Sequence, residues 1–155
     1  MNNNFELRIK ELGLILPPAP KAVGVYKPTL VSGNLLYVSG QLPFKPDGSL
    51  ITGKLGDDLS IEEGKLAARQ VGLTMISTIK EHFGDLNKIR RIIKTLGMVN
   101  CIPSFDKQPV VINGFSELMA EIFGEKNGIG VRSAVGMTLP SNVAVEVEAI
   151  FELAS

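Results

Sequence analysis

The sequence contains very few of the side chains that usually build metal sites and covalent nucleophiles. Its 155 residues include one cysteine, Cys101, one histidine, His82, and no tryptophan. A single cysteine excludes an intramolecular disulfide, and one thiol with one imidazole cannot form a zinc site. No loop has the ligand spacing of an EF-hand. We therefore expect neither a bound metal nor a cofactor, and we interpret Cys101 as an inert thiol.

Long apolar runs and an excess of one charge are also absent. No apolar run approaches the roughly 20 residues that span a bilayer, and the first residues, MNNNFELRIK, lack the apolar core of a secretory signal. These absences predict a cytoplasmic protein. The 16 basic and 16 acidic residues give a net charge of zero. That balance argues against nucleic-acid binding by bulk charge, because phosphate contacts draw on an excess of lysine and arginine.

The length predicts a single domain that spans residues 1–155. A chain of this size buries roughly two thirds of its unfolded surface. It contains no internal repeat, low-complexity tract or linker. The 45% apolar content and the mean hydropathy of +0.20 are high for a short chain, which is compatible with an oligomeric interface.

Apolar periodicity and turn residues predict interleaved helices and strands, and hence an α+β fold. The predicted order is a helix over 4–12, a hairpin of strands 28–32 and 35–39, a helix from Ser60 to Gly84, a strand over 89–100, a helix from Pro109 to Gly124, a loop over 124–130 and two strands within 131–153. Gly33-Asn34 suits the tight turn of the hairpin. Ser60 and Glu63 form a capping box, which makes the first long helix the clearest prediction.

The last strand has one apolar and one acidic face. Every second residue from Val143 to Leu153 is apolar, and Glu146, Glu148 and Glu152 occupy the opposite face. Such alternation usually marks a solvated side of an antiparallel sheet. The alternative is that another subunit covers this face, and that Arg132 and one glutamate line the interface between the two subunits. The small residues that follow Arg132 leave room for its side chain.

Four stretches of the sequence, read together, resemble a known family. They are GVYKP at 24–28, SGNLLYVSGQLP at 32–43, Asn113 within the second long helix, and VRSAVGMTLPSNVAVEVEA at 131–149. Together they resemble the reactive intermediate deaminases, also called RidA-like or YjgF-like proteins and formerly labelled L-PSP endoribonucleases. The spacing of Arg-Ser, Leu-Pro and Val-Glu-Val-Glu-Ala is the most specific part of the pattern.

The resemblance implies a fold and an assembly. It implies a chorismate-mutase-like domain with a mixed β-sheet, two main helices on one face, and residues 1–20 as an N-terminal helical and extended addition. It also implies a homotrimer with clefts between subunits, in which the acidic face lines an interface. A simple hairpin about Pro140 would place Arg132 opposite Glu148, whereas the last strand of the family is central and need not pair with its predecessor.

The resemblance further implies hydrolysis of enamines and imines, such as 2-aminoacrylate and 2-iminopropionate, to a 2-keto acid and ammonia. Arg132 would bind the substrate carboxylate, since a planar guanidinium suits a bidentate contact. Glu146 would hold and polarise the attacking water. The residues that would shape the substrate pocket are Tyr26, Ser39, Gly40, Asn113 and Ala134. Many members have a cysteine where this chain has Ala134, so substrate preference is open.

Two other functions remain open at this point. The same pocket could bind a small carboxylate metabolite without turnover, as in a sensor or chaperone-like protein. The older family label implies a ribonuclease or translation inhibitor, against which zero net charge and the lack of a histidine pair both argue. A small carboxylate-bearing imine or enamine is therefore the expected ligand, and neither nucleic acid nor a membrane is an expected partner.

Overall fold

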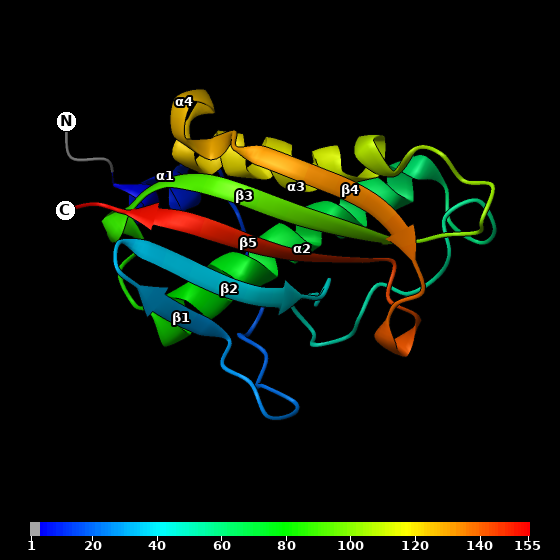
Figure 1. Ribbon diagram of the computed structural model, residues 1–155, viewed down its shortest axis with the longest axis horizontal. Coiled ribbons are helices and arrows are strands. Elements are labelled where there is room, and N and C mark those ends of the chain that lie inside the picture. The colour runs from blue at the N-terminus through cyan, green and yellow to red at the C-terminus, as the bar shows by residue number, and fades with distance from the viewer. Residues whose placement is uncertain (1–3) are drawn as a thin grey trace.

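A computed structural model describes residues 4–155 as one α+β domain built on a five-stranded mixed sheet (Figure 1). The strands are β1 (Thr29–Ser32), β2 (Leu35–Gln41), β3 (Ile89–Asn100), β4 (Val131–Met137) and β5 (Val145–Leu153). The helices are α1 (Phe5–Glu11), α2 (Ile61–His82), α3 (Gln108–Phe123) and α4 (Glu125–Gly128), with 3-10 turns η1 (Leu86–Lys88) and η2 (Pro140–Asn142). The predicted fold class is confirmed.

The sheet has the order β1-β2-β5-β3-β4. Strands β3 and β4 are parallel, and the other neighbouring pairs are antiparallel. The last strand is therefore central, and the hairpin considered about Pro140 does not form. Instead, Arg132 aligns with Thr95 of β3, which in turn aligns with Ala149 of β5.

Helices α2 and α3 cover one face of the sheet, as predicted (Figure 1). The capping box is present at the start of α2, where Ser60 and Glu63 exchange hydrogen bonds. The two helices cross closely at Gly114, where an added Cβ would lie 2.0 Å from the Lys65 carbonyl oxygen. The core between helices and sheet includes Phe115 and Phe151, both fully buried.

The helix predicted near the N-terminus is present as α1, and it packs onto this core. Phe5 and Ile9 of α1 are buried, and the Phe5 ring meets that of Phe123 with centroids 4.7 Å apart. The loop predicted over 124–130 is wrong in part, because its first residues form the short helix α4. No helix within residues 4–155 is long and apolar enough to cross a membrane.

The other face of the sheet carries exposed apolar side chains. One row across the strands aligns Leu30, Tyr37, Ile150, Lys94 and Val131. In this row Leu30, Tyr37 and Val131 are 51%, 41% and 67% exposed. A sheet face that is simply exposed to solvent would not be expected to carry so many large apolar side chains.

Candidate functional site

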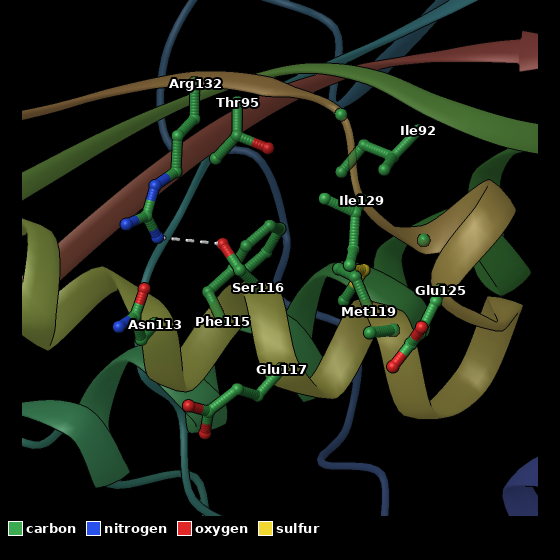
Figure 2. A pocket seen from close by; sticks show the side chains of 13 residues that line it. Ile92, Thr95, Asn113, Phe115, Ser116, Glu117, Met119, Glu125, Ile129 and Arg132 are labelled. Carbon is green, nitrogen blue, oxygen red and sulfur yellow. Dashed lines mark hydrogen bonds between the residues drawn. The ribbon is translucent and has the colours of Figure 1, made fainter.

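Arg132 lies at a cavity of about 440 Å³ between α3, α4 and strands β3 and β4 (Figure 2). Its guanidinium is held by α3: Nη1 donates to Ser116 Oγ and Nη2 donates to the Pro109 carbonyl oxygen, each at 3.1 Å. Three guanidinium N–H groups are left for a ligand, since arginine has five. Asn113 of α3 lines the same cavity.

The parallel pairing of β3 and β4 decides which way Arg132 points. Thr95, its neighbour on β3, is 5% exposed and aligns with the buried Ala149. Directly aligned residues project from the same face of a sheet, so Arg132 lies on the helix-covered face. Ala134, two residues further along β4, projects from that face too and packs against the core without lining this cavity.

Glu146 lies at a second cavity, of about 430 Å³, near the end of β2. Tyr26, Ser39 and Gly40 line it as well. The pairing of β2 with β5 shifts between Val38 and Gln41, so that Ser39 and Gly40 form a bulge in β2. Bulges of this kind re-aim side chains and are common beside active sites.

Gly40 makes the space for the carboxylate of Glu146. A Cβ at Gly40 would lie 2.9 Å from Glu146 Oε2 and 3.0 Å from its Cδ. No hydrogen bond or ion pair joins Glu146 to another side chain within residues 4–155, whereas Glu152 pairs with Arg91 at 2.5 Å. Burial, and secondly the nearby charge of Glu148, raise the pKa of Glu146. The result is a half-buried carboxylate that is more basic than an ordinary glutamate.

The residues predicted from the sequence thus fall into two groups. Tyr26, Ser39, Gly40 and Glu146 share the second cavity, Asn113 and Arg132 share the first, and Ala134 lines neither. Glu146 alternates with the buried Val145 and Val147, so it projects from the face opposite to Arg132. Within one chain, Arg132 and Glu146 do not meet.

Two hydroxyl-bearing residues beside Arg132, Ser116 and Thr95, were not predicted from the sequence as site residues. Ser116 accepts a hydrogen bond from Arg132, and the Thr95 side chain points into the cavity beside it (Figure 2). Ser116 could have been found from its position three residues after Asn113 on a predicted helix. The position of Thr95 beside Arg132 could not be predicted, because it follows from the register between β3 and β4, and no short sequence motif indicates that register.

No cluster of three or more histidine, cysteine, aspartate or glutamate side chains in the described part of the chain could hold a metal ion. The groups that line the two cavities include a guanidinium, a basic carboxylate, hydroxyls and amides. These groups can bind a carboxylate and activate a water molecule.

Residues 6–150 match the family model described as YjgF/chorismate mutase-like, putative endoribonuclease. Protein TCP17 of Trypanosoma cruzi is 42% identical over 94% of this chain and 91% of its own length. The 2-iminobutanoate/2-iminopropanoate deaminase of Dermatophagoides farinae is 28% identical over 86% of this chain and 90% of its own. A crystal structure of an Agrobacterium tumefaciens protein of unknown function has 43% identity and a TM-score of 0.87, and covers 99% of this chain and 96% of that one.

Proposed function

Because the chain belongs to the YjgF/chorismate mutase-like family, we propose that it hydrolyses reactive imines and enamines to 2-keto acids and ammonia. The observation that carries the proposal is the unpaired, half-buried carboxylate of Glu146 in the space left by Gly40. A carboxylate that no side chain of its own described chain engages is available to take a proton from water. The relative from Dermatophagoides farinae that is named a deaminase supports the same assignment.

Arg132 binds the substrate carboxylate in this proposal. Its contacts with Ser116 and Pro109 fix the plane of the guanidinium before a ligand arrives. A preorganised guanidinium orients the substrate with little loss of side-chain entropy on binding. The imine carbon is bonded directly to the carboxylate carbon, so it is held close to Arg132.

Glu146 activates the attacking water. Its carboxylate takes a proton from water while the water oxygen bonds to the carbon of the protonated imine. The resulting carbinolamine loses its C–N bond after the nitrogen receives a proton from Glu146, and loss of the hydroxyl proton to solvent completes the keto group. The iminium ion and one water molecule thus give a 2-keto acid, ammonia and one proton released to solvent, and Glu146 returns to its ionised form. A protonated imine is already electrophilic, so orientation and one base suffice for the reaction.

The site requires two copies of the chain in this proposal. Arg132 and Glu146 project from opposite faces of one sheet, and the uncovered face is apolar enough to be an interface. We propose a homotrimer in which Arg132 of one subunit meets Glu146 of the next. This assembly would also shield the exposed apolar side chains Leu30, Tyr37 and Val131 from water.

Mixing of two inactive variants tests both parts of the proposal. We expect Arg132→Ala and Glu146→Gln each to lower pyruvate release from freshly generated 2-iminopropionate by about 100-fold or more. If the two variants are unfolded together and refolded as mixed rings, about one quarter of the sites should carry both native side chains. Activity should therefore return to about that fraction of the wild-type rate.

Three outcomes would contradict the proposal. No rate above buffer for the native protein would remove the deaminase assignment, and calorimetric binding without turnover would favour the ligand-binding alternative. A mixture as inactive as its components would contradict the shared site. Arg91→Ala is the matched control, because Arg91 is exposed, pairs with Glu152 and lines neither cavity.

A further inference from the structure

The Arg132 cavity has a polar end and an apolar end (Figure 2). Side chains that can hydrogen-bond gather at one end, and hydrophobic side chains gather at the other. The polar group is Thr95, Asn113, Ser116 and Arg132, and the apolar group is Ile92, Phe115, Met119, Ala120 and Ile129. A cavity divided in this way suits a ligand with one charged head and one apolar tail.

The polar end has hydrogen-bonding capacity left over. Thr95 is 5% exposed, and its side chain lines the cavity beside Arg132 (Figure 2). The Asn113 amide is without a partner in the described chain, and Arg132 retains three N–H donors after its contacts with α3. Hydroxyl, amide and guanidinium groups that face one cavity can together bind a ligand carboxylate.

At the apolar end, the accessible apolar surface belongs to Ile129, which is 60% exposed, with a small share from Ile92 at 3%. Phe115 and Met119 are fully buried and back this surface. Glu125 lies beyond Met119 at this end (Figure 2). Glu117 also lines the cavity and pairs with Lys65 at 3.8 Å. The charge of Glu125 would repel a second carboxylate, so the tail that fits here is uncharged.

Volume also favours a tail longer than a methyl group. Pockets of about 300–1,000 Å³ typically bind ligands larger than 2-iminopropionate, which has six non-hydrogen atoms. The cavity holds about 440 Å³. A three-carbon ligand on Arg132 would leave the apolar end empty.

We infer that this cavity selects monocarboxylic imines, and their keto-acid products, that carry a branched or extended apolar side chain, and that Thr95 helps to bind their carboxylate. The inference rests on the proposed function, because it takes Arg132 as the carboxylate site. With the carboxylate on Arg132, the reacting carbon stays at the cavity mouth and the tail extends towards Met119. The partner's Glu146 would reach that carbon from outside.

Calorimetry with keto acids of graded length tests the inference on the native protein. The probes are pyruvate, 2-oxopentanoate, 4-methyl-2-oxopentanoate and 2-oxoglutarate. Affinity should rise by about fourfold for each methylene that is buried, so 4-methyl-2-oxopentanoate should bind at least tenfold more tightly than pyruvate. 2-Oxoglutarate has the same carbon chain as 2-oxopentanoate and should bind more weakly. Equal affinities across the series, a preference for 2-oxoglutarate or no binding of any probe would overturn the inference.

Two substitutions separate the head and tail of the site. Thr95→Val keeps the side-chain shape and should weaken all monocarboxylates by a similar factor of several-fold, with Thr95→Ser restoring affinity. Ile129→Trp, at a position that is 60% exposed, should reduce the cavity and weaken only the long-tailed ligands. Thermal melting identifies any variant that fails to fold. A Thr95→Val protein with native affinities, or an Ile129→Trp protein that still prefers long tails, would contradict the assignment.

The same series distinguishes this inference from the proposed function. Tail-dependent binding without hydrolysis of any imine would leave the inference standing and remove the deaminase activity. Hydrolysis of alanine-derived and leucine-derived imines at equal kcat/KM, with equal keto-acid affinities, would support the deaminase activity and overturn the inference about the apolar tail.

Discussion

The Arg132 and Glu146 cavities are similar in size but differ in how each holds its charged group. Arg132 is fixed by two hydrogen bonds from its guanidinium to α3. Glu146 has no side-chain partner in the described chain and is positioned by the space above Gly40. One cavity therefore stabilises its charge in a set geometry, while the other leaves its charge uncompensated.

The difference matches two separate chemical tasks. A binding group gains from being fixed, because the ligand then loses less entropy on orienting it. A general base gains from a pKa closer to the working pH, and burial without a counter-ion gives that shift. Within one chain the two groups are kept apart, because Arg132 and Glu146 project from opposite faces of the sheet.

Gly40→Ala is expected to have the largest effect on the Glu146 side of this comparison. The new Cβ would stand 2.9 Å from Glu146 Oε2, and the carboxylate is the flexible partner that must move. A displacement of about 1 Å at a catalytic group costs on the order of 100-fold in rate. We expect kcat for imine hydrolysis to fall by about that factor.

The melting temperature should change little in the same variant, because the end of one side chain absorbs the contact. Differential scanning calorimetry and the pyruvate-release assay check the two parts separately. A variant with native kcat would show that the position of the Glu146 carboxylate does not limit the reaction.

Ser116→Ala is expected to have a smaller effect, on the Arg132 side. It removes the acceptor for Arg132 Nη1 and leaves the bond to Pro109 in place. A lost hydrogen bond of this kind costs about 0.5–1.5 kcal/mol, or roughly 2- to 10-fold in affinity. KM and the keto-acid Kd should rise by this factor while kcat is retained. Ser133→Ala, beside Arg132 on β4, is the control, and an equal effect in both variants would refute a positioning role for Ser116.

The sequence predicted the elements well because their signals are local. The Ser60 and Glu63 capping box, the Gly33-Asn34 turn and the alternation of the last strand each act within a few residues. The motifs around Arg132 and Glu146 were enough to identify the family, which the match over residues 6–150 confirms.

The arrangement of the site was less predictable because it depends on strand order. No short sequence motif indicates that β4 pairs in parallel with β3 rather than with β5. That pairing separates Arg132 from Glu146, brings Thr95 beside Arg132 and excludes the hairpin about Pro140. The α4 helix was missed because Gly124, Gly128 and Gly130 favour a loop by propensity, whereas tight packing against α3 decides the outcome at Gly128.

The smallest expected effect is a shift of the pH profile in Glu148→Gln. Glu146 must be ionised to act as a base, so the acid limb of kcat/KM follows its pKa, which burial and the charge of Glu148 both raise. Burial is the larger cause of that shift and remains in the variant, while the repulsion from Glu148 is removed. The acid limb should therefore move part of the way towards lower pH, with the plateau unchanged.

Glu152→Gln is the control on the same strand face, since Glu152 is paired with Arg91 and should leave the limb in place. A limb that stays fixed in Glu148→Gln, or moves to higher pH, would mean that Glu148 does not raise the pKa of the base.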